Sequence, residues 1–190
     1  RTFAGHTYDL MGVGVFPLVE LPGIRVQTFH CPATAGWVGA SANAAVALQV
    51  GSENVMVLGD SVQVNGVFTS QSVGAVSLSY SGGSIDVSVG GLQLTSRTVA
   101  TANIPTGYLQ NVRVEVDEQL VEGFSPSICA VTSGGGGCPA ALVAPDEIVF
   151  DGGMATALGT LCGSPDATQA SSCTQSIPPC DVCGDASVSI

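Results

Sequence analysis

The segment most suggestive of catalysis is the tripeptide Gly59-Asp60-Ser61, which follows the apolar run 55–58. A serine in such a position becomes a nucleophile only when a histidine is placed to take its proton. The chain has two histidines, His6 and His30, and both lie early, outside the late Asp-x-x-His pattern that would supply a general base. We therefore interpret the tripeptide as part of a hairpin turn, and the sequence predicts no enzyme.

Cysteines are the second group with chemical potential. There are seven, an odd number, and six of them lie in the last 62 residues among Gly, Pro, Ser and Thr. This clustering is typical of a disulfide-stapled extracellular segment. The odd count means that at least one thiol is free or joins another chain. The disulfide candidates are Cys129, Cys138, Cys162, Cys173, Cys180 and Cys183.

Other chemistry for these thiols is less well supported by the sequence. Cys180 and Cys183 have the spacing of half a zinc site, with Cys162 and Cys173 as the second pair, but disulfides are the better interpretation in a secreted chain. Redox activity would need a βαβ context, which the sequence lacks. His30 and Cys31 are adjacent, so on a strand they point to opposite faces and cannot act together.

Charge is scarce and strongly acidic. The 190 residues include 15 carboxylates and four basic residues, for a net charge of −11, and 10% are charged against 45% hydrophobic. Clustered Lys and Arg bind phosphate backbones and anionic membranes, and this chain has no lysine. No apolar run reaches the roughly 18 residues of a membrane span. We therefore expect neither nucleic acid nor a membrane span, and a surface made soluble by hydroxyl groups or covered by partners.

The elements that must position these residues are short strands. Runs rich in β-branched residues alternate with turn signals such as Pro22-Gly23, Asn65-Gly66 and Gly90-Gly91. The spacing predicts strands at 15–19, 24–29, 44–50, 55–58, 61–64, 75–80, 84–89, 92–95 and 112–116. Regular short strands with tight turns favour an all-β fold, an antiparallel sandwich or barrel. The best helical candidate is short, at 153–161.

The amino-acid composition of the chain changes after about residue 124. Residues 133–137 contain four consecutive glycines between Cys129 and Cys138, a loop that one disulfide would tether. The sequence therefore predicts a β-sandwich core at 1–124 and a Gly/Ser/Cys-rich, irregular extension at 125–190 that packs on the same domain. The chain has no secretory leader at its start, so we expect a processed product or a piece of a longer protein.

The opening residues 1–12, RTFAGHTYDLMG, resemble the start of a von Willebrand factor type D domain. The following strand at 14–18, the Val-Gln strand at 24–29 and the hairpins from 44 to 66 are similar to the next elements of that family. The resemblance covers about residues 1 to 70. From there to residue 116 only the general pattern of strands and turns is similar. It implies an antiparallel β-sandwich of type D and an extracellular protein that assembles with copies of itself.

This sequence departs from the type D pattern at two informative positions. Ala4 stands where calcium-binding members have an aspartate, and Gly14 stands where the family has a cysteine. Residues 160–166 are similar to the family's calcium loop, with Ser164 in place of asparagine and Asp166 retained. Whether the loop holds Ca²⁺ is left open, and Asp166 is the one ligand candidate.

These observations favour a non-catalytic, secreted structural module that assembles into a polymer, filament or cell-surface coat. Its expected partners are itself or other subunits, and its Ser/Thr-rich stretches leave O-linked glycans open. One alternative is an adhesive or carbohydrate-binding module, which needs an exposed patch with two or more aromatic side chains; Trp37 is a weak candidate. A less favoured alternative is an esterase of the SGNH type, with Ser61 as nucleophile.

Overall fold

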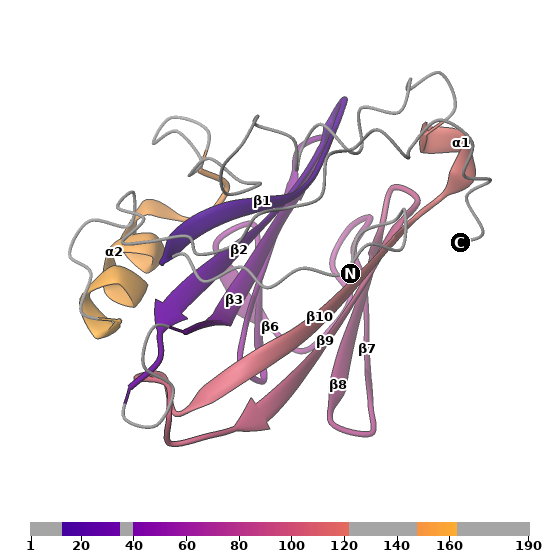
Figure 1. Cartoon of the computed structure of the whole chain (residues 1–190). Helices are drawn as coiled ribbons and strands as arrows, with labels where there is room; N and C mark the ends of the chain where they lie inside the picture. The colour runs from indigo at the N-terminus through magenta and orange to yellow at the C-terminus, as the bar shows by residue number, and fades with distance from the viewer. Residues whose placement is uncertain (1–12, 35–39, 122–147, 163–190) are drawn as a thin grey trace, which may run out of the picture.

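The computed structural model describes residues 13–34, 40–121 and 148–162, and these form two antiparallel sheets with little helix (Figure 1). The all-β prediction is confirmed. Each of the predicted strands corresponds to a strand of the structure. The structure adds one strand that the sequence did not predict, at Val67–Thr69.

The larger sheet has six strands in the order of the chain, each antiparallel to the next. Short turns join most neighbours, so the sheet grows strand by strand from local hairpins. Its strands are β1 (Gly14–Leu21), β2 (Ile24–Pro32), β3 (Ser41–Val50), β4 (Glu53–Leu58), β5 (Ser61–Val64) and β6 (Val67–Thr69).

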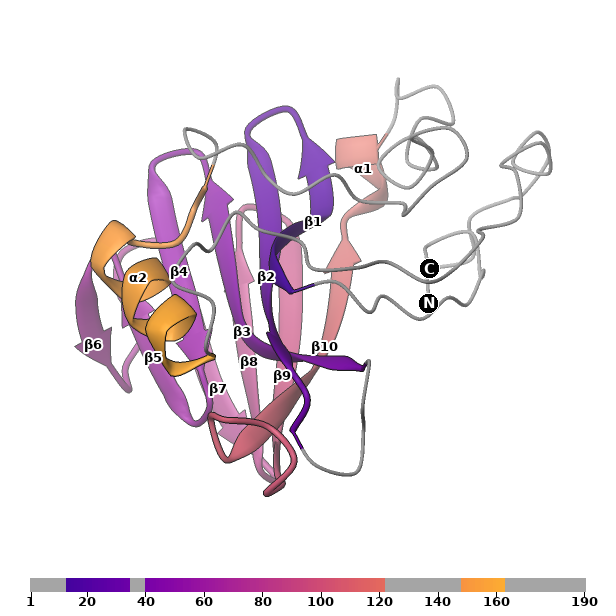
Figure 2. The same cartoon turned by 60° about the vertical axis from the view of Figure 1, so that its left-hand side comes forward.

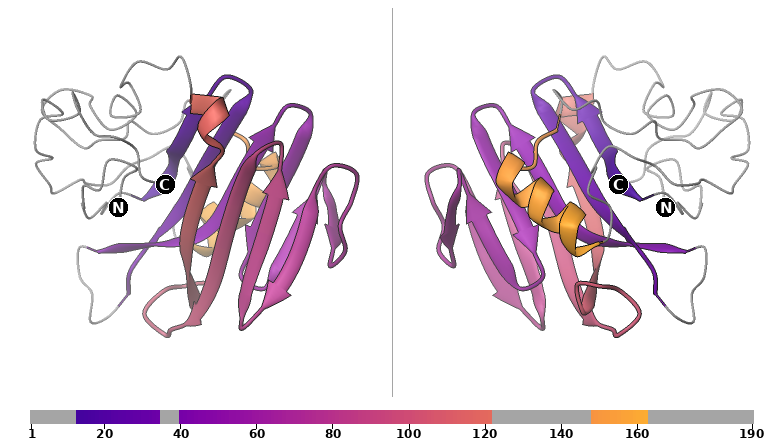
Figure 3. Two further views of the ribbon diagram at one scale, coloured as in Figure 1. Left: turned by 90° about the vertical axis from the view of Figure 1, so that its right-hand side faces the viewer. Right: turned by 90° about the vertical axis from the view of Figure 1, so that its left-hand side faces the viewer.

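The smaller sheet has four strands in the order β10-β9-β8-β7 and packs across one face of the larger sheet (Figure 3). Two of its turns are glycine pairs, Gly82-Gly83 and Gly90-Gly91, and all four of these glycines have positive φ. Its strands are β7 (Ser77–Ser81), β8 (Ser84–Val89), β9 (Leu92–Ala100) and β10 (Tyr108–Val116).

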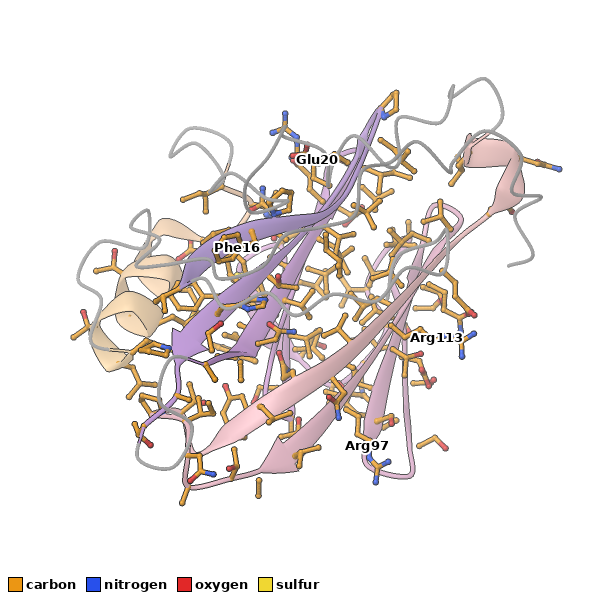
Figure 4. All side chains as sticks on the ribbon, viewed as in Figure 1. Phe16, Glu20, Arg97 and Arg113 are labelled. Carbon is orange, nitrogen blue, oxygen red and sulfur yellow. A yellow bond between two sulfur atoms is a disulfide. The ribbon has the colours of Figure 1, made fainter. Side chains whose placement is uncertain are left out.

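Alternating side chains from the two sheets make the main core. In β8, Ile85, Val87 and Val89 are buried while the residues between them are half-buried, as the period of two predicts. They meet the inward residues of the larger sheet, such as Val46 and Leu48 of β3. The charged side chains of the smaller sheet, including Arg97 and Arg113, extend from its outer face (Figure 4).

A helix covers the other face of the larger sheet. Helix α2 (Gly152–Leu161) lies over this face, so the molecule has three layers: helix, larger sheet and smaller sheet (Figures 2 and 3). The helix confirms the prediction at 153–161. A four-residue helix, α1 (Glu118–Val121), follows β10.

The three layers explain the unusual run in β3. Residues 44–48 are all buried, because one set of side chains faces the smaller sheet and the other faces α2. Ala45 and Ala47 face α2, where their small side chains leave room for the helix layer. The predicted division between core and extension at residue 124 lies outside the described residues. Within the described part, 148–162 packs on the larger sheet.

Candidate functional site

The tripeptide Gly59-Asp60-Ser61 forms the predicted hairpin turn. Gly59 has a φ of 57°, and Leu58 pairs with Ser61 across the turn from β4 to β5. Val57 and Val62, the adjacent pair, belong to the core between the sheets. Because side chains alternate along a strand, Ser61 points to the opposite face, which carries α2.

His30 lies on the other face of the same sheet, so it cannot serve Ser61 as a base. Side chains alternate along β2, so Val26, Thr28 and His30 point to the same face. Val26 belongs to the core between the two sheets, and His30 therefore faces the smaller sheet as well. The Thr28 Oγ1 atom lies 3.1 Å from His30 Nε2, and the His30 ring packs edge-on against Phe16. The other candidate base, His6, lies outside the described residues.

The surroundings of His30 keep its ring neutral. Its Nδ1 atom is enclosed and has no hydrogen-bond partner among the described residues. Burial without a compensating charge lowers the pKa of His30 from 6.5 to about 4. His30 is thus a polar residue built into the sandwich and is uncharged at neutral pH.

Cys31 points away from His30 and forms a disulfide with Cys162. The bond joins strand β2 to the end of α2 across 131 residues of sequence, with a Cα–Cα distance of 5.2 Å. Cys162 was a predicted disulfide candidate, whereas its partner Cys31 was not. The remaining candidates, Cys129, Cys138, Cys173, Cys180 and Cys183, lie outside the described residues.

Polar contacts to the segment before α2 complete its attachment. The Val149 N–H donates to Gln27 Oε1 at 2.8 Å, and Asn54 Nδ2 donates to the Val149 carbonyl at 2.8 Å. Phe150 packs edge-on against Phe29, and the Asp151 side chain accepts from the first N–H groups of α2. The segment 148–162 is thus attached to the larger sheet by apolar, polar and covalent contacts.

The predicted calcium ligand Asp166 lies outside the described residues, as does Trp37. Within the described ranges, no group of three or more His, Cys, Asp or Glu side chains is placed to hold a metal ion. The binding of calcium by Asp166 therefore stays a prediction.

The feature most suited to a partner is one edge of the sandwich, which we call the open edge and define as β6, the connection 70–76 and β7. β6 ends the larger sheet and β7 ends the smaller one. Seven large hydrophobic residues are exposed in the described part of the chain, and four belong to the open edge. Those four are Val67, Phe68, Val73 and Tyr80, with exposed fractions of 67%, 58%, 41% and 46%.

The open edge contains no charged residue of its own, although two carboxylates lie beside it: Glu53 near Gly74 and Asp86 at Ser79. No charged residue occurs between Asp60 and Asp86, although the whole chain carries a net charge of −11. Exposed edge strands offer unpaired backbone groups, and proteins commonly protect them with charges, proline or bulges. None of these three devices is present along β6 or β7, and what limits the edge of β6 is its length of three residues.

The opposite edge, formed by β1 and β10, has such protection. β1 carries Pro17 beside a register irregularity and Glu20 further along (Figure 4). β10 carries the exposed ion pair of Arg113 and Glu115. The two edges of the sandwich are therefore unlike, and only the open edge is apolar and uncharged.

The two exposed aromatic side chains of the open edge leave from different faces. Phe68 pairs with Gln63, on the face of the larger sheet that carries α2. Tyr80 pairs with Ile85, on the face of the smaller sheet that meets the larger one. A carbohydrate-binding patch needs two or more exposed aromatic side chains, and the open edge has two. Phe68 and Tyr80 point in different directions, however, so their rings do not form one stacking surface.

Comparison with known proteins adds no relative: no family model matches the chain, and no curated protein matches its sequence. The resemblance of residues 1–12 to the type D family thus stays a prediction. Among the helices of the described ranges, none has the length and apolar character needed to cross a bilayer.

Proposed function

We propose that this chain is a non-catalytic, extracellular structural module that assembles with other subunits into a polymer, filament or coat. The observation that carries the proposal is the open edge, which exposes four large hydrophobic side chains and has no charged residue, proline or bulge. Exposed apolar patches on strand edges are typical of surfaces that bind other chains. The acidic remainder of the surface keeps the subunit soluble and directs contacts to this edge.

The disulfide supports the extracellular part of the proposal. Disulfides between segments far apart in sequence persist in oxidising compartments and are rare in the cytosol. The pair Cys31–Cys162 accounts for two of the seven cysteines, and the other five are still an odd number. At least one of them is free or joins a second chain.

We further propose that the chain is a divergent type D domain. The support is the motif at 1–12 and the segment 160–166, which resembles the family's calcium loop. Cys162 of that segment forms the disulfide with Cys31 on β2. The family's cysteine position is Gly14 in this chain, and a side chain there would lie on the His30 face of the sheet, opposite to Cys31.

A second candidate is a carbohydrate-binding module, favoured by the exposed rings of Phe68 and Tyr80. Glycan-array binding that is lost in Phe68→Ala and Tyr80→Ala would support it. The esterase alternative has less support, since Ser61 and His30 occupy opposite faces. Labelling of Ser61 by a serine-reactive phosphonate would revive it.

The proposed assembly is tested by sedimentation velocity of the intact chain over a wide range of concentration, followed by electron microscopy. We expect species larger than the monomer that grow with concentration. The same runs with and without a thiol reductant show whether the odd cysteine links chains. A chain that stays monomeric at the highest concentration contradicts the proposal.

A further inference from the structure

We propose that strand β6 pairs antiparallel with β6 of a second copy of this chain, around a two-fold axis at Phe68. This inference rests on the proposed function, since it names the partner and the contact for assembly. It is carried by the backbone register of β6, by its side chains and by the distribution of charge.

The backbone of β6 has hydrogen-bonding groups directed away from its own sheet. The Asn65-Gly66 turn, with φ values of 49° and 83°, joins Val64 directly to its pair Val67. In a two-residue hairpin the residues that flank the turn exchange both hydrogen bonds, and every second pair repeats this. Val67 and Thr69 therefore bond to β5, and Phe68 turns its N–H and C=O outward.

The edge of β7 is less open than that of β6. The Leu78 N–H, which the same alternation directs outward, donates to Ser72 Oγ at 2.9 Å. The connection 70–76 thus covers part of β7. No described residue bonds to the outward groups of Phe68. β6 is consequently the better place for a new strand.

A two-fold axis at Phe68 makes this edge complementary to itself. Phe68 of each copy would exchange both backbone hydrogen bonds with Phe68 of the other, and Val67 would lie opposite Thr69. Residues opposite each other in an antiparallel pair share a face, so the two phenylalanine rings would be neighbours. Such aromatic and β-branched cross-strand pairs stabilise sheets, and here they would cover the most exposed rings and methyl groups of the edge.

Charge explains why a second copy is the fitting partner. Two chains of net charge −11 repel each other on approach. The repulsion is weakest where the chain presents no carboxylate of its own, and β6 lies in such a stretch, between Asp60 and Asp86, with Glu53 beside it at Asn65. A strongly basic partner would instead be drawn to the acidic surface, so the neutral edge does not favour it.

The protected opposite edge limits the growth of the sheet. Joining two copies at β6 produces one continuous sheet, in which β1 is the outermost described strand at each end. Pro17 and the register irregularity in β1 disfavour a further strand there. The contact at β6 is therefore a closed two-fold dimer, which is the first step of the proposed assembly.

The test compares matched variants of the intact chain by sedimentation equilibrium. Val67→Asp puts a carboxylate into the proposed contact, and Val99→Asp makes the same change at another exposed strand valine, on β9. We expect Val67→Asp to raise the dimer dissociation constant at least about tenfold, because a like charge is introduced on both sides. Val99→Asp should leave the constant within about twofold, as changes to exposed side chains generally have small effects.

A second pair of variants separates the backbone contact from the side chain. Phe68→Ala and Phe68→Pro both remove the ring, but only proline also removes the outward N–H. We expect the proline variant to dimerise more weakly than the alanine variant, with far-ultraviolet circular dichroism of both matching the parent. Equal dimerisation by the two, in folded proteins, would contradict backbone pairing at Phe68.

The outcomes distinguish this inference from the proposed function. Assembly of the parent that Val67→Asp and Val99→Asp leave equally intact overturns the β6 contact but keeps the assembly proposal. A parent that is monomeric at every concentration overturns both.

Discussion

At the scale of single residues, the two side chains that looked most reactive are kept apart by the alternation of strands. Ser61 lies in a hairpin turn on the α2 face, and His30 lies on the face toward the smaller sheet. His30 is held by Thr28 and Phe16, with its Nδ1 unpaired among the described residues. Because the buried His30 ring resists protonation, the stability of the fold depends on pH.

We predict that the domain loses stability as the pH falls below about 6.5 because of His30. The pKa of the ring is lowered to about 4 in the folded chain from 6.5, so the unfolded chain binds a proton first on acidification. The stability that neutral His30 provides is therefore complete above 6.5 and is lost progressively as the pH approaches 4. A shift of this size corresponds to about 3 kcal/mol.

Urea unfolding of the parent and of His30→Asn at pH 7 and at pH 4 measures this effect. The variant lacks the titrating ring, so its stability should fall less between the two pH values. The carboxylates of the chain titrate in both proteins and cancel in the comparison. An equal fall in parent and variant would show that His30 does not titrate in this window.

At the scale of elements, α2 depends on the sheet beneath it. A ten-residue helix is marginal by itself in water, and α2 includes three glycines, at 152, 153 and 159. It is secured by the Cys31–Cys162 disulfide at its end, and by the bonds from Gln27 and Asn54 to Val149 before its start. Both ends of the layer are thus attached to strands β2 and β4.

We predict that Cys31→Ser and Cys162→Ser each lower the free energy of unfolding by about 2–4 kcal/mol. Each removes the same bond, which closes a loop of 131 residues in the unfolded chain. The double variant should therefore cost no more than either single one. Chemical denaturation of the three variants provides the measurement.

Hydrogen exchange locates the effect of losing the disulfide. The amides of α2 should lose protection, while those of β8 and β9, which belong to the far sheet, should retain it. Additive costs in the double variant would mean that the two cysteines stabilise the fold through separate contacts. Loss of protection throughout the molecule would mean that α2 is part of one cooperative unit with both sheets.

At the scale of the whole molecule, the sandwich has two unlike edges and a strongly acidic charge. The open edge has no charged residue of its own and exposes four large hydrophobic side chains, whereas the edge of β1 and β10 carries proline, a register irregularity and charges. This asymmetry gives the molecule one preferred direction for contact. Repulsion between like-charged copies opposes that contact over longer distances.

We predict that self-association strengthens as salt is added. Raising the ionic strength from about 0.01 M to about 0.15 M shortens the screening length from about 30 Å to about 8 Å. The repulsion between two copies of net charge −11 then weakens, while the apolar edge is little affected. Sedimentation equilibrium at the two ionic strengths measures the dissociation constant.

Salt is a cleaner probe than acid, because acidification also protonates His30 and destabilises the fold. Sodium chloride and potassium chloride should have the same effect if screening is responsible. Association that weakens with salt would indicate a contact between opposite charges and would contradict the neutral-edge interpretation.

The local elements of this chain could be predicted from its sequence because their causes are local. Asn65-Gly66, Gly82-Gly83 and Gly90-Gly91 adopt the positive φ values that tight hairpins need, and the alternation in β8 follows from half-burial. The helix at α2 was also predicted to within one residue. Strand β6 was missed, since three residues are too few to show a period and its pairing with β5 defines it.

The sequence by itself thus determined the order of strands and turns apart from β6, the short helix, the acidic charge and the stretch without charged residues between Asp60 and Asp86. Only the tertiary structure decided that Cys31 meets Cys162, that His30 and Ser61 face apart, and that the neutral stretch forms an edge of the sandwich. The physical reason is distance along the chain. Turns and alternation depend on a few adjacent residues, whereas a bond across 131 residues and an open sheet edge exist only after both sheets and the helix have packed.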